Sequence, residues 1–178
     1  KGFVSYHQDA KYIGLEPHNW VTAWVAITDS NEHNGCMRIW SGSHKDNLKK
    51  HNQMFNEGNL LTRGQTVNNV PIEKTTPLIL EAGQMSLHHP TVVHGSDLNK
   101  SNDRRIGFVI QSYIGTNVKQ VLGKNGVQLA RGKDNYNFHE TIERPKSLMD
   151  KNDIKIKKQE NDNLHEIFYK GSSKKGNY

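Results

Sequence analysis

Apolar residues are concentrated in two blocks of the chain, residues 3–40 and 76–114, with polar stretches between and after them. Within these blocks they fall in short runs rich in Val, Ile, Thr and aromatic residues, a pattern typical of β-strands. Gly, Pro, Asn and Asp separate the runs, as is usual for turns. We therefore predict strands over residues 3–9, 20–29, 36–40, 77–80, 84–89, 91–96 and 104–114.

Short strands at close spacing predict an antiparallel barrel or sandwich and not alternating helices and strands. Residues 45–70 are rich in Lys and Asn without a clear period, so we predict a long loop there, with at most a helical turn. Loops of this length are uncommon in compact domains and often functional, for example as lids. Residues 115–178 should wrap around the outside, with one helix over 161–170. The 178 residues fit a single domain with core strands at about 3–114 and a peripheral C-terminal segment.

Charge and composition narrow the possible partners. The formal charge is +6, but the lysine-rich runs near the C-terminus alternate with acidic and polar residues, which is more typical of solvated surface than of a nucleic-acid interface. The single Cys36 excludes an internal disulfide, and no apolar run approaches the roughly 20 residues of a membrane span. We therefore predict a soluble, cytoplasmic protein without nucleic-acid or membrane partners, whose oligomeric state the sequence leaves open. Because the chain begins at Lys1, we expect N-terminal elements to be missing, together with any targeting signal upstream.

The histidines carry the candidate chemistry. His7 and Asp9 lie two residues apart in a predicted strand, where residues i and i+2 share a face. They form either a hydrogen-bonded pair on a solvated face or half of a metal site. Iron(II) in oxygen-activating enzymes is commonly held by two histidines and one carboxylate, with the other positions open. The third ligand would come from "LHHPTVVHG", where spacing alone does not choose among His88, His89 and His94.

The surrounding residues are more specific. The segments "HQD", "TAWVAITDSNEHNGCMRIWSGSHK" and "GQMSLHHPTVVHGSDLNKSNDRRIGFVIQSY" closely resemble, in order and approximate spacing, the phytanoyl-CoA dioxygenase family of iron(II)- and 2-oxoglutarate-dependent oxygenases. The resemblance extends from about residue 3 to 116. It implies a double-stranded β-helix, which is a jelly-roll, cupin-like barrel of eight strands, all-β with peripheral helices. It also implies an enzyme that couples decarboxylation of 2-oxoglutarate to succinate and CO2 with hydroxylation, by O2, of a small organic molecule or an acyl chain.

Carried over residue by residue, the resemblance assigns the site. The implied iron ligands are His7, Asp9 and His94. The implied 2-oxoglutarate contacts are Arg105, Trp24 and Ser96.

These assignments have physical reasons. A guanidinium presents a planar fork that pairs with a carboxylate through two parallel hydrogen bonds, so Arg105 can hold the far carboxylate of 2-oxoglutarate. Adjacent Arg104 should point to the other face of the strand. Trp24 offers a wide apolar wall. We expect His88 and His89 to be core groups or to support the ligands.

Asp9 narrows the chemistry further. Related halogenating enzymes replace the carboxylate ligand with a small residue, so its presence favours hydroxylation over halogenation. One alternative is a nucleic-acid demethylase on the same barrel, suggested by the charge; those enzymes typically carry a more widely spaced arginine pair than Arg104 and Arg105. The other alternative is a non-catalytic barrel that binds metal or ligand without turnover. The sequence does not identify the primary substrate.

Overall fold

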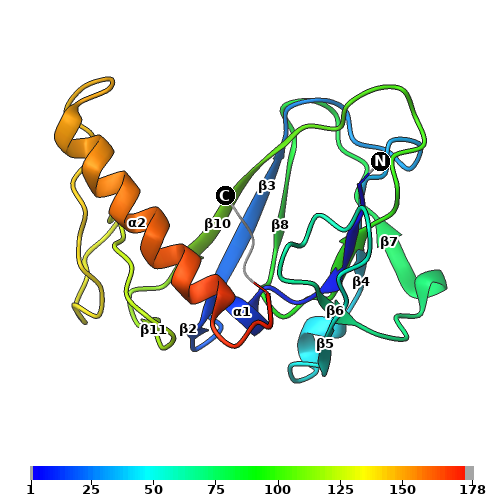
Figure 1. The fold of residues 1–178 in the computed structure, drawn as a ribbon, viewed down its shortest axis with the longest axis horizontal. Helices are drawn as coiled ribbons and strands as arrows, with labels where there is room; N and C mark the ends of the chain where they lie inside the picture. Colours follow the sequence, from blue (N-terminus) through cyan, green and yellow to red (C-terminus); the bar gives the residue numbers. More distant parts are fainter. Residues whose placement is uncertain (1, 175–178) are drawn as a thin grey trace.

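The structure is a computed structural model that describes residues 2–174. Its centre is a pair of antiparallel β-sheets (Figure 1). A cavity lies between the two sheets. One sheet has the order β1-β9-β4-β7 and the other the order β10-β3-β8. The strands are β1 (Val4–His7), β9 (His94–Ser96), β4 (Met37–Trp40), β7 (Thr75–Pro77), β10 (Gly107–Ile114), β3 (Trp20–Ala26) and β8 (Met85–His88).

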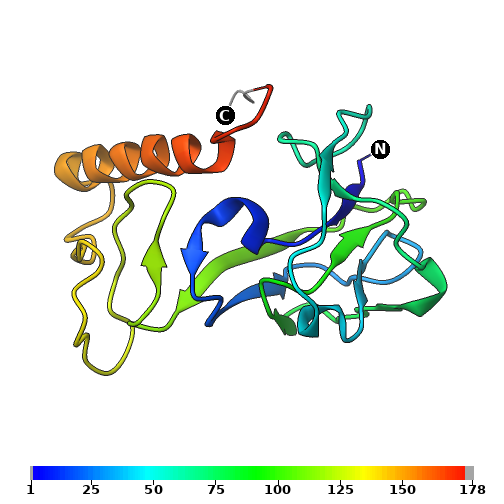
Figure 2. The same ribbon diagram turned by 90° about the horizontal axis from the view of Figure 1, so that it is seen from below.

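Smaller elements surround the two sheets. Helix α2 lies along the outside, next to the β2–β11 ribbon, and both views place it away from the four-stranded sheet (Figures 1 and 2). The remaining elements are α1 (Ala10–Ile13), β2 (Leu15–Glu16), β5 (His51–Gln53), β6 (Gln65–Val67), β11 (Lys119–Gln120), α2 (Lys151–Tyr169) and 3₁₀ turns at Ser43–Lys45 and Ile72–Lys74.

The predicted fold class is confirmed: the chain is mostly β, with peripheral helices, in a jelly-roll arrangement. Strands were correctly predicted within residues 20–29, 36–40, 84–89, 91–96 and 104–114. Among residues 2–174 the two sheets do not close into a continuous barrel. The arrangement is therefore an open jelly roll with a cavity between its sheets.

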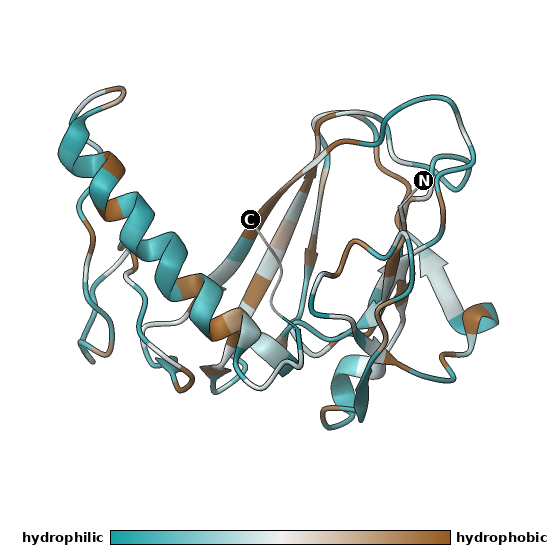
Figure 3. Ribbon diagram, viewed as in Figure 1, coloured by the Kyte–Doolittle hydropathy of each residue, from teal (hydrophilic) through white to brown (hydrophobic). Residues whose placement is uncertain are grey.

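Four predicted elements need correction. The strand predicted over 3–9 ends at His7, and the segment predicted over 77–80 forms a strand only up to Pro77, leaving an isolated bridge at Leu80. The 45–70 segment is not one unbroken loop, because β5 and β6 pair as a hairpin within it. The helix predicted over 161–170 begins ten residues earlier: Asp150 caps it by accepting hydrogen bonds from two backbone N–H groups of the first turn. The first half of α2 is mostly hydrophilic (Figure 3), so the sequence showed no amphipathic pattern from which to predict it.

A hydrophobic cluster fixes the position of α1 beside the site. It consists of Ala10, Ile13, Leu15, Trp20 and Val118, with Tyr12, Ile114 and Phe168 packed against it. This cluster joins α1 to β3, to the segment before β11 and to the end of α2. The residue that precedes α1 is Asp9, so the cluster also holds the candidate carboxylate in place. No helix in the described part of the chain has the length and apolar character needed to cross a membrane.

Candidate metal centre

The imidazoles of His7 and His94 meet because β1 contains one extra residue. Val4 pairs with Ser96 and His7 pairs with His94, so three steps along β1 match two steps along β9. This β-bulge places His7 directly opposite His94, with the ring centroids 4.2 Å apart. Gly95 accommodates the bulge, because a Cβ there would lie 2.8 Å from the carbonyl oxygen of Val4 and 3.0 Å from the backbone nitrogen of Tyr6.

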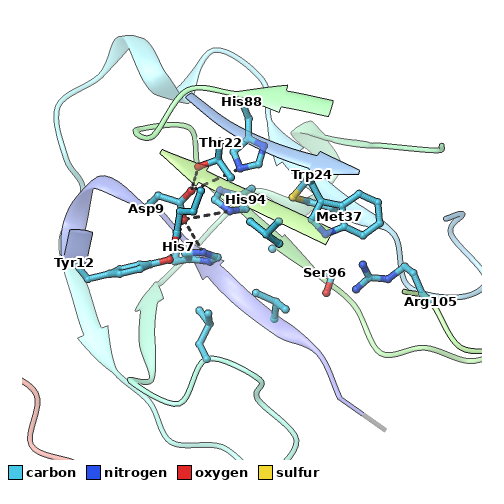
Figure 4. A pocket seen from close by; sticks show the side chains of 15 residues that line it. His7, Asp9, Tyr12, Thr22, Trp24, Met37, His88, His94, Ser96 and Arg105 are labelled. Carbon is cyan, nitrogen blue, oxygen red and sulfur yellow. Dashed lines mark hydrogen bonds and ion pairs between the residues drawn. The ribbon is translucent and has the colours of Figure 1, made fainter. Parts of the chain in front are cut away.

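Asp9 reaches the same place by a turn and not by strand alternation. Its backbone is helical, with φ −57° and ψ −40°, and it immediately precedes α1. The prediction that Asp9 shares a strand face with His7 was therefore wrong about the backbone, although the two side chains do converge. Asp9 Oδ1 lies 3.4 Å from His7 Nε2 and 3.7 Å from His94 Nε2. All three side chains are buried, and their donor atoms lie within 4.8 Å of one another (Figure 4).

The hydrogen bonds of the two imidazoles fix which nitrogen faces the centre. His7 Nδ1 lies 2.8 Å from the carbonyl oxygen of Ser5, and His94 Nδ1 lies 3.1 Å from that of Val92. A carbonyl only accepts, so Nδ1 of each ring carries a proton, and the ring in its neutral form turns an Nε2 lone pair toward Asp9. Two imidazole nitrogens and one carboxylate oxygen thus face one another, a donor set that suits a metal ion.

Charges at this centre also suit a metal. Burial by itself would raise the pKa of Asp9, but the neighbouring imidazoles of His94, His7 and His88 outweigh it and hold the pKa well below the usual range. Burial lowers the pKa of His94 to about 3. At neutral pH Asp9 is therefore an ionised carboxylate and His94 a neutral imidazole, the forms in which these residues bind metals.

The Asp9 carboxylate is held at both oxygens. Tyr12 donates its hydroxyl to Oδ1 at 2.9 Å, and Thr22 donates to Oδ2 at 3.0 Å. Thr22 lies on β3, in the sheet opposite β1 and β9. The carboxylate is therefore fixed by two elements that do not supply the histidines, which limits its freedom to swing away from them.

Gln8, between the two candidate ligands, is a residue that the sequence prediction missed. It is fully buried; its amide nitrogen donates to Thr91 and its amide oxygen accepts from the backbone of Lys49. Its backbone N–H donates to His51 Nε2. A buried Gln that is hydrogen-bonded through both its amide nitrogen and its amide oxygen fixes the turn from β1 into α1. The signal was a polar residue between two candidate ligands, but the sequence does not say what it contacts.

A cavity of about 200 Å³ extends from the three donor atoms between the two sheets. Trp24, Ser96 and Arg105 line it away from the donor atoms, as Figure 4 shows. Arg105 is half-buried, with its guanidinium carbon 5.5 Å from the centre of the Trp24 ring, and no acidic side chain among residues 2–174 forms an ion pair with it. Ser96 Oγ is buried without a hydrogen-bond partner in the described chain. This end of the cavity thus offers an uncompensated cation and an unused hydroxyl, which suits an anionic ligand.

His88, His89 and Arg104 differ in their position relative to the cavity. His88 is buried and lines the cavity, with Nε2 3.7 Å from Asp9 Oδ2, but it is not part of the three-residue donor group. His89 is outside the cavity, and its Nδ1 lies 2.8 Å from Thr91 Oγ1. Arg104 is exposed, as its place beside Arg105 predicted.

Comparisons with known proteins give consistent matches. A family model described as "Phytanoyl-CoA dioxygenase (PhyH)" matches residues 1–107. "Phytanoyl-CoA dioxygenase, peroxisomal" of Mus musculus is 30% identical over 122 residues, covering 67% of this chain and 36% of the mouse protein. The solved structure "non-heme monooxygenase; ThoJ apo" superposes with a TM-score of 0.81 at 27% identity, covering 95% of this chain and 61% of that one. The "ThoJ-Ni complex" superposes with a TM-score of 0.70 at 27% identity, covering 91% and 57%.

These matches differ in how much of each relative they cover. This chain spans about a third of the length of the mouse protein and about three fifths of the ThoJ chain. The likeness to ThoJ includes residues beyond the family match, because it covers nearly all of this chain.

Proposed function

The chain belongs to the phytanoyl-CoA dioxygenase family, and on this premise we propose that it acts as an iron(II)- and 2-oxoglutarate-dependent dioxygenase that hydroxylates a small organic molecule or an acyl chain. In the overall reaction, 2-oxoglutarate, O2 and a C–H bond of the substrate give succinate, CO2 and an alcohol. The observation that supports this most is the convergence of two Nε2 atoms and one carboxylate oxygen at one end of a cavity. The other end of the cavity holds a guanidinium without an ion-pair partner among residues 2–174.

His7, Asp9 and His94 would hold the iron. Two histidines and one carboxylate occupy one side of a metal and leave the remaining positions to other ligands. Bound iron(II), together with 2-oxoglutarate, supplies the activation of O2 that drives the oxidation. The chain's own contribution is to fix the donors. The carbonyls of Ser5 and Val92 hold the two rings in the required tautomer.

Arg105, Ser96 and Trp24 would bind 2-oxoglutarate. The Arg105 guanidinium would pair with the carboxylate distant from the metal, and Ser96 Oγ would give that carboxylate a further hydrogen bond. Trp24 would keep water away, since its indole forms a wall of the cavity beside Arg105. A half-buried arginine without an acidic partner is costly unless an anion accompanies it, which favours this role over a structural one.

Direct assay of the reaction tests the proposal. Purified protein with iron(II), ascorbate, O2 and 2-oxoglutarate should form succinate slowly without a primary substrate. A panel of small acids, amino acids and acyl thioesters should contain a compound that accelerates it. Asp9→Ala should abolish both rates. If the folded wild type binds iron(II) and 2-oxoglutarate but forms no succinate with any compound, the non-catalytic barrel is the better account.

Partners and location follow as finer proposals. We expect a small-molecule substrate and O2 and no nucleic-acid partner, because the lysine-rich helix α2 mixes its charges with acids, as in the Lys158–Asp162 pair. We predict a cytoplasmic location, whereas the mouse relative is named as peroxisomal. Fluorescence microscopy of the complete natural protein distinguishes the two compartments.

A further inference from the structure

We propose that the C-terminal turn of α2, residues Phe168–Lys170, is a positioning element for the metal site and acts on Asp9 through Tyr12. This inference rests on the proposed metal-binding function. The family match ends at residue 107, so α2 lies outside it.

Tyr12 is the contact between this turn and the carboxylate. Its hydroxyl donates to Asp9 Oδ1, the oxygen nearest both Nε2 atoms. Its ring stacks on His7, with centroids 5.9 Å apart and planes inclined by 30°. One side chain thus touches two of the three donor residues, so a displacement of Tyr12 would be transmitted to both.

Phe168 packs against the Tyr12 ring. The two rings meet edge to face, with centroids 6.1 Å apart and an interplanar angle of 83°. This is a favourable geometry for an aromatic pair and contributes beyond the area that it buries. Neighbouring Tyr169 is buried, so the last turn of α2 is anchored although most of the helix is exposed.

Arg63 binds the backbone at the C-terminal end of α2. Its guanidinium donates to the carbonyls of Phe168 and, at 2.7 Å, Lys170. The last carbonyls of a helix lack partners within the helix and carry partial negative charge, so a cation there caps it. The guanidinium carbon also lies 6.0 Å from the centre of the Tyr12 ring.

The same contact orders one wall of the cavity. Arg63 follows Leu61, which lines the cavity, and Thr62 between them shares a hydrogen bond with the Tyr169 hydroxyl. Docking of the α2 turn therefore sets both the orientation of the Asp9 carboxylate and the position of the Leu61 side chain. A segment remote in sequence from every candidate ligand thereby shapes the site.

A double-mutant cycle on metal affinity tests this role. Cobalt(II) is titrated into the full chain without 2-oxoglutarate, and its visible absorption is followed for wild type, Tyr12→Phe, Phe168→Leu and the double variant. Loss of the Tyr12 hydroxyl should weaken binding roughly 10-fold, the low end of the effect of outer-sphere partners of metal ligands. Phe168→Leu should weaken binding in the same direction and alter the absorption band. The double variant should bind no more weakly than Tyr12→Phe alone, because Phe168 acts through the Tyr12 hydroxyl.

Ile167→Val serves as the matched control, since Ile167 precedes Phe168 and is buried, but packs beside Gly123. It should lower the thermal midpoint and leave cobalt(II) affinity unchanged. If Phe168→Leu stays folded and binds cobalt(II) like the wild type, or if the two effects add, the positioning role is refuted. If the folded wild type itself binds no cobalt(II), the proposed metal site and this inference fail together.

Discussion

His7 and His94 face each other across β1 and β9 only because β1 contains one extra residue between Val4 and His7. Without this bulge, regular pairing from Val4 and Ser96 would place Tyr6 opposite His94. The two rings are 4.2 Å apart, and the pairing of β1 with β9 brings them together.

We predict that His94, and not His88, completes the donor set with His7 and Asp9. His94→Ala should abolish cobalt(II) binding in the concentration range where the wild type saturates, because it removes a buried lone pair that faces Asp9. His88→Ala should retain binding, with a loss of no more than roughly 10- to 100-fold, because His88 contacts the other oxygen of Asp9. Calorimetric titration measures both. Equal loss in the two variants would contradict the assignment.

Arg105 and Arg104 form a matched pair for the cosubstrate. Arg105→Met should raise the 2-oxoglutarate concentration needed for half-maximal succinate formation by roughly 10- to 100-fold, since a charge-assisted contact of about 1.5–3 kcal/mol is lost. Exposed Arg104→Met removes the same charge from the next position and should leave that concentration unchanged. A similar rise in both variants would point to general electrostatics and would remove Arg105 from its specific role.

Substitution of Gly107 tests whether the Trp24 indole borders the bound 2-oxoglutarate. A Cβ at position 107 would lie 2.0 Å from the Trp24 ring, so Gly107→Ala must displace the indole. We expect weaker 2-oxoglutarate binding, a changed tryptophan emission spectrum and a stability loss of roughly 1–3 kcal/mol. Phe108→Ala, at the exposed neighbouring position, should change the emission and the 2-oxoglutarate affinity little. Unchanged affinity in Gly107→Ala would show that the indole does not border the cosubstrate.

His51 predicts a pH dependence of stability for the metal-free protein. Burial lowers the pKa of His51 to about 4, from an ordinary value of 6.5. Between these values the unfolded chain binds the proton and the folded chain does not, so stability should fall as the pH drops from about 6.5 to about 4. Above pH 6.5 this residue contributes no slope.

Chemical unfolding at a series of pH values tests this dependence. His51→Gln should flatten the decline, and exposed His33→Gln should leave it as in the wild type. His94, whose pKa burial lowers to about 3, adds a decline in the same direction and remains in both variants. A wild-type stability independent of pH between 4 and 6.5 would contradict the burial of a neutral imidazole at position 51.

The strands and the candidate ligands could be predicted from the sequence in part. The runs rich in β-branched and aromatic residues around Trp24 and His94 predicted strands in both sheets, because such residues favour the extended backbone. The family resemblance chose His94 from the three histidines that spacing left open, but the bulge opposite it depends on pairing between residues distant in sequence, which no local pattern encodes. Asp9 lies beside His7 and His94 as the resemblance implied, but it reaches them through a helical turn and not through a strand, since α1 is only four residues long.

The support around the site was less predictable. Gln8, Tyr12 and Phe168 owe their importance to partners far away or to packing, and their residue types are ordinary. The β5–β6 hairpin was missed because "HNQ" and "QTV" lack the apolar alternation of a typical strand. The two strands pair through backbone hydrogen bonds, which residues of almost any type can form, so the side chains gave no signal.

An anaerobic titration of the protein with iron(II) and then 2-oxoglutarate, followed by visible absorption, tests the three-residue iron site directly. We predict a weak charge-transfer band that saturates at one iron per chain, disappears in His94→Ala and requires more 2-oxoglutarate in Arg105→Met. If the folded, complete natural protein develops no band, or if the band persists unchanged in His94→Ala, then the three side chains do not form the iron site.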